Sequence, residues 1–200
     1  RKHTRAEVFR AAWARAWPQL PIRFQASFFN DPSIKGLGCL VGHYMALHHL
    51  FANLGGDFDY VLMLEDDALP FEGTTWPGVG GPNNLDKHLD DLKKIGGSGL
   101  VLGGHHFRGW DMADVTALAG TAHGGIARAT SAWGSYAYVL PRSSAYAVLR
   151  HYRIHIDAAK PGERLLGPDD VLWEKLEMIR ARRGGEGGGY VSTPLLVDHA

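Results

Sequence analysis

The sequence predicts an α/β fold with a mostly parallel sheet. Short apolar runs of strand length alternate along the chain with segments of helical periodicity, which is the pattern of βαβ units. The run Tyr60–Leu64 is apolar at every position, which predicts a central, parallel strand that is covered on both faces. The chain has 200 residues, of which 45% are hydrophobic, and this suits one buried core. We therefore expect residues 1–200 to form a single domain.

Turn residues and apolar periodicity divide the first part of the chain into four elements. Residues 5–17 carry apolar residues on one helical side and are followed by two prolines. A second helical segment ends at Gly55-Gly56, which is a strong C-terminal stop. The expected elements are helices over residues 5–17 and Leu37–Leu54, and strands over residues 22–28 and Tyr60–Leu64.

The rest of the chain alternates between helices and strands around one irregular stretch. Asn83 suits a helix N-cap, and Pro141 and Pro168 suit first helical turns. Residues 105–130 are rich in glycine, and we expect them to form a loop over the site. The expected elements are helices over residues 83–95, 141–152 and 168–182, and strands over residues 99–103, 136–140 and 190–197.

Three consecutive carboxylates, Glu65, Asp66 and Asp67, directly follow the apolar strand. In open α/β sheets, ligands bind beyond the carboxyl ends of the strands. Clustered carboxylates repel one another, and hard oxygen ligands favour Mn²⁺ or Mg²⁺. A diphosphate would complete the coordination, and the metal would neutralise the charge that builds on a leaving nucleoside diphosphate. The cluster therefore indicates the chemistry that a sugar-nucleotide transferase needs.

Two other interpretations of the acidic cluster remain open: a solvated turn, and the metal site of a hydrolase or nuclease. Lys+Arg and Asp+Glu each number 21, and without a basic stripe we expect no nucleic-acid partner. No apolar run reaches the roughly 18 residues of a membrane span. The single cysteine, Cys39, excludes an internal disulfide. It leaves the compartment open between the cytoplasm and the lumen of the endoplasmic reticulum or Golgi.

Five segments, taken in order, resemble those of glycosyltransferase family 25, which includes lipooligosaccharide and procollagen galactosyltransferases. Residues 36–44 (GLGCLVGHY) are similar to the family's G-x-x-G-C-x-x-S-H segment, with Gly42 where the family has serine. Residues 64–67 (LEDD) match its L-E-D-D motif. Residues 133–140 (WGSYAYVL), 168–170 (PDD) and 194–197 (PLLV) resemble its later segments. The ordered combination is more specific than any one segment.

The resemblance implies a GT-A-like, three-layer α/β/α fold that transfers a hexose, galactose from UDP-galactose, to a hydroxyl of a glycan or glycoprotein acceptor. It implies that Glu65 and Asp67 hold Mn²⁺ or Mg²⁺, with Asp66 supporting them, beside the bound UDP-sugar. The family's first strand, which helps to hold the nucleotide base, would be missing before Arg1. The missing strand favours the alternative of a non-catalytic binding or assembly module, and a metal-dependent phosphoesterase is a further alternative.

Asp169 and Asp170 follow Pro168 at a predicted helix start. Acidic residues in a first helical turn are stabilised by about 0.3–1 kcal/mol, so one interpretation is purely structural. The other is a general base that deprotonates the acceptor hydroxyl. The family resemblance implies that an inverting transfer needs such a base, and Asp170 is then the preferred candidate.

Further candidates each have a structural alternative. Cys39 and His43 lie on one helical face, either as a metal pair or, as we expect, as a packed cysteine and a hydrogen-bonded histidine. The resemblance implies that His43 faces the site and contacts the substrate. His199 would complete the metal coordination or belong to a frayed chain end. Gly104 would line the sugar pocket or form an ordinary turn. Three aromatic residues would stack on sugars or join the core: Trp110, Trp133 and Tyr136.

Overall fold

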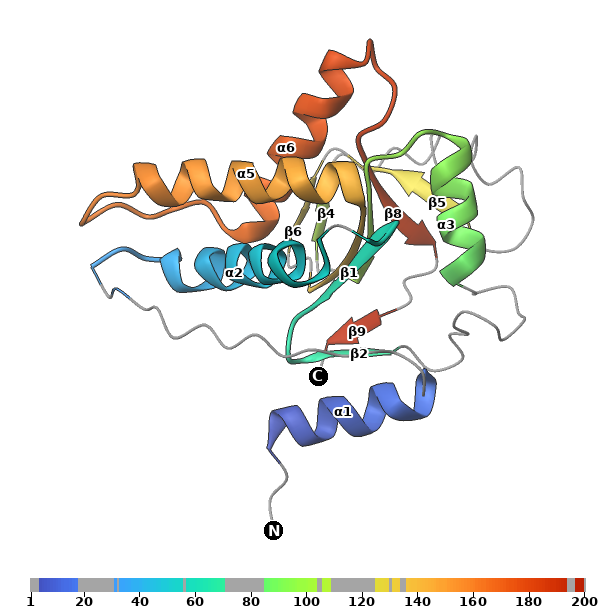
Figure 1. Ribbon diagram of the computed structural model, residues 1–200, viewed down its shortest axis with the longest axis horizontal. Coiled ribbons are helices and arrows are strands. Elements are labelled where there is room, and N and C mark those ends of the chain that lie inside the picture. Colours follow the sequence, from blue (N-terminus) through green and yellow to red (C-terminus); the bar gives the residue numbers. More distant parts are fainter. Residues whose placement is uncertain are drawn as a thin grey trace.

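The computed structural model of this chain describes residues 4–17, 31, 33–55, 57–70, 85–103, 106–108, 125–129, 131–133, 136–193 and 197–199. It is an α/β structure in which helices cover both faces of a five-stranded sheet (Figure 1). The described helices are α1 (Arg5–Ala16), α2 (Leu37–Leu54), α3 (Leu85–Lys94), α5 (Arg142–Ala158) and α6 (Pro168–Arg182). The described strands are β1 (Tyr60–Leu64), β2 (Ala68–Pro70), β3 (Gly99–Gly103), β4 (His106–Arg108), β5 (Gly125–Arg128), β6 (Ser131–Trp133), β7 (Ala137–Pro141), β8 (Gly189–Thr193) and β9 (Val197–His199).

The central sheet has the strand order β1-β7-β3-β8-β5 and is mixed, so the expectation of a mostly parallel sheet is wrong. Strands β1, β3 and β8 run in one direction, whereas β7 and β5 run in the other. Among the described pairings of this sheet, only β3 with β8 is parallel. The alternation of strands and helices does not reveal that β7 inserts antiparallel between β1 and β3, because strand order is set by long-range pairing.

Strand β1 has the residues predicted for it but not the predicted central position. Among the described strands it is the end strand of the sheet, paired only with β7. Val61 and Met63 face one apolar cluster, while Tyr60, Leu62 and Leu64 face the other. The continuous apolar run thus reflects contacts on both faces. Only Val61 is buried, and the other four side chains of β1 are half-buried.

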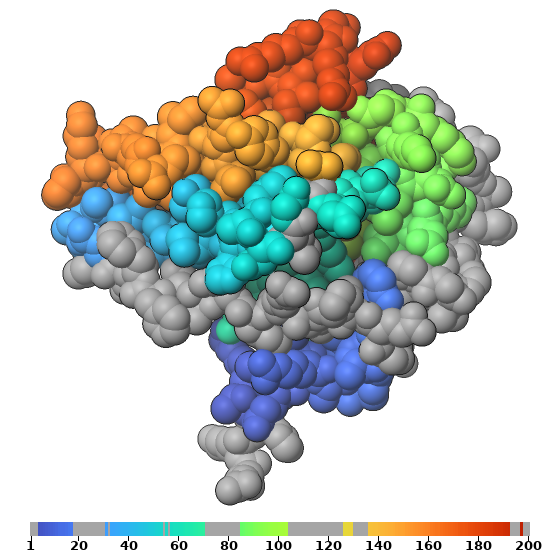
Figure 2. Space-filling model, in the orientation of Figure 1, coloured from blue at the N-terminus to red at the C-terminus, as the bar shows by residue number. Residues whose placement is uncertain are grey.

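Two apolar clusters cover the two faces of the sheet. On one face, α2, α5 and α6 contribute large buried side chains such as Leu47, Tyr152 and Leu176. On the other face, α1 and α3 contribute Trp13 and Leu92. Helices α2 and α5 lie side by side across the surface that Figure 2 shows, with α6 above them. None of the helices within the described ranges is long and apolar enough to cross a membrane.

The ends of the helices follow local sequence chemistry, which explains why most of their bounds were predictable. Thr4 and Glu7 form a capping box at the start of α1. Gly55 ends α2 with a φ of 57°, a left-handed conformation that glycine adopts without steric cost. Pro168 occupies the first turn of α6. Helix α5 is longer than expected, because no breaker follows Tyr152 before Ala158.

The last strand predicted for residues 190–197 is in fact two strands in different sheets. β8 joins the central sheet, and β9 pairs antiparallel with the short strand β2. Residues 105–130 are also not a simple loop, since β4 and β5 lie within them. The strand expected over residues 22–28 and the N-cap expected at Asn83 lie outside the described residues.

Candidate functional site

The acidic cluster lies at the sheet edge where β1, β3 and β8 end and β7 begins. The backbone N–H of Glu65 donates to the carbonyl of Tyr136 at 2.8 Å, which fixes the exit of the chain from β1. At the end of β3, a β-carbon on Gly103 would overlap the Tyr136 ring and would lie 2.6 Å from the carbonyl oxygen of Val197. A glycine is therefore needed where these strand ends crowd together.

The three carboxylates of the cluster differ in exposure. The side chains of Glu65 and Asp67 are 36% and 17% exposed, whereas Asp66 is exposed. The N–H of Ala68 donates to the Glu65 carbonyl at 3.1 Å and closes the turn that carries all three. An oxygen of Asp67 lies 3.8 Å from the guanidinium of Arg5 on α1. The first and third carboxylates are thus the ones turned toward the protein.

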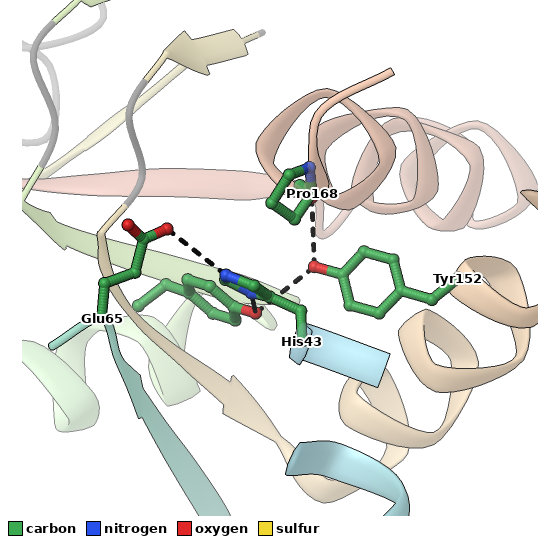
Figure 3. Close-up of polar contacts among 5 residues, drawn as sticks. His43, Glu65, Tyr152 and Pro168 are labelled. Carbon is green, nitrogen blue, oxygen red and sulfur yellow. Dashed lines mark hydrogen bonds and ion pairs between the residues drawn. The ribbon is translucent and has the colours of Figure 1, made fainter. Parts of the chain in front are cut away.

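His43 on α2 connects Glu65 to Tyr138, with one ring nitrogen facing each of them. Its Nε2 lies 3.3 Å from an oxygen of Glu65, and its Nδ1 lies 2.8 Å from the hydroxyl of Tyr138. The chain of contacts continues through the Tyr152 hydroxyl, 3.3 Å from that of Tyr138. Tyr152 then donates to the Pro168 carbonyl at 3.1 Å. Figure 3 shows this continuous line from the end of β1 to the start of α6.

The electrostatic state of His43 follows from these partners. Burial acts to lower the pKa of His43, but Tyr138, Cys39 and Glu65 together outweigh burial and raise the pKa well above its usual range. A protonated imidazole donates from both nitrogens, which matches acceptors on both sides. Burial and the neighbouring Tyr138 raise the pKa of Tyr152, which therefore stays a neutral hydroxyl. The network is a fixed hydrogen-bonded support for Glu65.

The expectation of a packed cysteine and a hydrogen-bonded histidine is confirmed for His43 and wrong for Cys39. His43 is a hydrogen-bonded histidine, as predicted, but Cys39 is exposed and is not a packed cysteine. One ligand atom from each of Cys39, His43 and Glu65 lies within 4.8 Å of the others. Because both nitrogens of His43 already have partners, the oxygens of Glu65 and Asp67 are the better ligands for a hard cation here.

The first turn of α6 lies at the other end of the hydrogen-bonded line. The carboxylate of Asp170 accepts from the N–H of Gly167 at 3.4 Å, which completes the capping interaction that the structural interpretation predicts. A β-carbon on Gly167 would overlap the carboxylate of Asp169, so that side chain also lies against the start of the helix. The role of Asp170 as a base stays a prediction.

The remaining predicted residues fall into three groups. The backbone of His199 lies opposite Ala68 in the pairing of β9 with β2, so the chain end is folded back beside the acidic cluster and is not frayed. Tyr136 is buried and belongs to the core. Gly104 and Trp110 lie outside the described residues, and Trp133 is described only as part of the backbone of β6.

Sequence reasoning missed Tyr138 and Tyr152, which connect the acidic cluster to the first turn of α6. Both are fully buried, and a buried tyrosine hydroxyl needs a hydrogen-bond partner. The available signal was a tyrosine in the middle of an otherwise apolar strand, at Tyr138. That signal does not identify the hydrogen-bond partner, because His43 lies on α2, far from Tyr138 in the sequence.

A surface hollow of about 720 Å³ lies at the opposite end of β1. Its lining includes Phe51 of α2, Phe58 just before β1, Pro141 at the end of β7 and Tyr146 of α5. Because β1 separates this hollow from Glu65, it does not belong to the acidic site.

The chain as a whole was compared with known proteins. No protein-family model matches it, and no curated protein matches it.

Proposed function

We propose that this chain is a metal-dependent glycosyltransferase domain, which moves a hexose from a UDP-sugar to a hydroxyl of a glycan or glycoprotein. The observation that carries the proposal is the placement of Glu65 and Asp67. They follow β1 at an edge where three strand ends converge, which is where open α/β sheets bind ligands. Galactose as the sugar rests only on the resemblance to glycosyltransferase family 25.

The donor set fits a hard divalent cation such as Mn²⁺. Glu65 and Asp67 offer carboxylate oxygens that are only partly exposed, and β9 brings the backbone of His199 back beside them. When bound, such an ion would neutralise the charge on the leaving nucleoside diphosphate. His43 would keep Glu65 oriented toward this position through the 3.3 Å contact.

The transfer itself needs a base for the acceptor. The acceptor oxygen forms the new bond to the anomeric carbon, the bond from that carbon to the diphosphate oxygen breaks, and the acceptor proton passes to a carboxylate. We assign that carboxylate to Asp170, with Asp169 as the second choice. The hydrogen bond that Asp170 accepts from Gly167 is long, at 3.4 Å. An interaction of that length is readily exchanged for one with an acceptor hydroxyl.

One observation favours the alternative of a non-catalytic binding module. Glu65 already lies beside His43 and Asp67 beside Arg5, so each carboxylate has a cationic neighbour. The Arg5 side chain, however, is 75% exposed, and exposed pairs contribute only about 0–1 kcal/mol. A divalent ion would displace Arg5 from Asp67 at little cost, so the Arg5–Asp67 ion pair is compatible with metal binding.

The proposal is tested by measuring release of UDP from UDP-galactose and other UDP-sugars, with Mn²⁺, with Mg²⁺ and with EDTA. We expect release that depends on the metal and that rises when a glycan acceptor is added. Hydrolysis of simple phosphate esters instead of sugar nucleotides would identify a phosphoesterase. Binding of UDP without turnover would identify a binding module.

A further inference from the structure

A second group of histidine and carboxylate side chains lies where α5 crosses α6, away from the acidic cluster. His151 and His155 are four residues apart on α5, so their side chains share one helical face. Glu174 reaches them from α6. One ligand atom from each of the three lies within 4.8 Å of the others. This group does not contribute to the proposed transfer.

The three side chains converge on one point. Nε2 of His151 and Nε2 of His155 lie 3.3 Å and 3.1 Å from the same carboxylate oxygen, Oε2 of Glu174. The two imidazole rings stand edge to face, with centroids 4.8 Å apart. Ligand atoms bound at about 2.0–2.1 Å around a tetrahedral ion lie roughly 3.3–3.4 Å from each other. The observed separations from Glu174 are close to that spacing.

His151, the buried member of the group, gives the strongest indication of a bound ion. The side chain of His151 is only 8% exposed, and among the described residues its Nε2 has no hydrogen-bond partner. The 3.3 Å approach to Glu174 is an ion-pair distance and does not count as a hydrogen bond to this nitrogen. Such a group needs an explanation, and an unseen ion is one of the common ones.

The protonation of His151 suits a metal ligand. Burial lowers the pKa of His151, and the nearby His155 and Lys175 add to this effect, against the opposing contribution of Glu174. A neutral imidazole has a free lone pair, which is the form that binds metals. The convergent geometry carries the inference, and the lowered pKa of His151 agrees with it.

We propose that His151, His155 and Glu174 form a Zn²⁺ site that joins α5 to α6. Imidazole nitrogens favour zinc and similar transition metals over Mg²⁺, and two histidines with one glutamate are a known zinc ligand set. Three protein ligands leave the fourth position open. The side chains of His155 and Glu174 are 23% and 45% exposed, so the ion can enter from solvent.

Zinc at this position would fix the start of α6. Glu174 lies one helical turn after Asp170, and Tyr152, which binds the Pro168 carbonyl, directly follows His151. A bound ion would therefore hold the first turns of α6 against α5. The inference concerns binding of the ion and does not rest on the proposed transferase activity.

The test is a zinc titration of the full chain against a chromophoric chelator. We expect one Zn²⁺ per chain, with affinity reduced more than about 10-fold in His155→Ala and in Glu174→Gln, since losing even an outer partner of a ligand costs about 10–100-fold. His48→Ala is the matched control, because His48 is an exposed histidine on α2. This control should bind zinc as the wild type does.

Two further measurements keep the proposal falsifiable. Both ligand variants alter partly exposed side chains, and circular dichroism will verify that each is folded. Cobalt substituted for zinc should give a spectrum without a thiolate charge-transfer band, and Cys39→Ser should leave the affinity unchanged. The proposal is overturned if the wild type shows no saturable site, if His155→Ala and Glu174→Gln bind as tightly as wild type, or if Cys39→Ser abolishes binding.

Discussion

The end of β1 and the crossing of α5 with α6 both place histidine beside a glutamate, yet the two arrangements differ in what the histidine does. At the end of β1, both nitrogens of His43 have hydrogen-bond partners, so the ring supports Glu65. At the helix crossing, the Nε2 atoms of His151 and His155 both aim at one oxygen of Glu174. A histidine near a carboxylate is thus a positioning group in one place and a candidate ligand in the other.

The difference predicts two kinds of metal preference in one chain. The β1 end offers carboxylate oxygens, which suit Mn²⁺ or Mg²⁺. The helix crossing offers two nitrogens and a carboxylate, which suit zinc. Variants at one region should leave metal binding at the other region unchanged.

The largest effect is expected at Asp67. Asp67→Asn, like Asp67→Ala, should reduce Mn²⁺-dependent UDP release to the level seen with EDTA. The loss should reach about 10²–10⁴-fold, because a bound metal supplies several kcal/mol of charge stabilisation and about 1.4 kcal/mol is tenfold in rate. The measurement is UDP release at saturating donor.

Glu174→Gln is the matched control for that change. It should lower zinc affinity and leave UDP release, measured with Mn²⁺ and without zinc, unaffected, while Asp67→Asn should leave zinc affinity as in wild type. Loss of both properties in either variant would show that the two regions are not separate sites.

The next largest effect is expected at Asp170, where one substitution distinguishes a general base from a helix cap. Asp170→Asn keeps an oxygen that can accept from the N–H of Gly167, but it cannot take a proton. If Asp170 is the base, turnover should fall about 10²–10⁴-fold with unchanged UDP affinity. Asp169→Asn, on the same helical turn, is the control and should retain most activity. Turnover within a few-fold of wild type in Asp170→Asn would leave Asp170 with the capping role alone.

The two buried histidines should give opposite pH dependence in metal-free protein. The pKa of His43 is raised, so its contribution to stability is full below the unfolded value of about 6.5 and is lost as pH rises through the folded pKa. The pKa of His151 is lowered, so its contribution is present above about 6.5 and is lost as pH falls through the folded pKa.

Urea unfolding with EDTA present tests this contrast. His43→Gln should cost roughly 1–3 kcal/mol near pH 6, the usual cost of leaving a buried partner unsatisfied, and less near pH 9. His151→Gln should cost more near pH 8 than near pH 5. The same pH trend in both variants would contradict the assigned protonation states.

The smallest effect is expected at Arg5. Arg5→Gln removes an exposed cation 3.8 Å from Asp67, and the change in unfolding free energy should be within about 0.2–1 kcal/mol. Mn²⁺ affinity should stay equal or rise slightly, because the ion no longer competes with the guanidinium. A large fall in Mn²⁺ affinity would mean that Arg5 orders the site.

Local patterns predicted most of the elements around both regions. Strand β1, helix α2 and helix α6 have the predicted bounds, because an apolar run, a Gly55 stop and a Pro168 start are encoded within a few residues. The bounds of β7 and α5 shifted, and β2, β4, β5 and β6 were missed. Short strands have little periodicity of their own and form only when a distant partner supplies the hydrogen bonds.

The sequence by itself determined the α/β class, the contiguous acidic cluster and its place directly after a strand. Those features rest on neighbouring residues, whose geometry follows from backbone periodicity. Only the tertiary structure decided that β7 inserts antiparallel, that β9 folds back beside Ala68, and that His43 supports Glu65. It also decided the meeting of His151 and His155 with Glu174. These residues are far apart in sequence or on different helices, and packing of the two apolar clusters, not local pattern, brings them together.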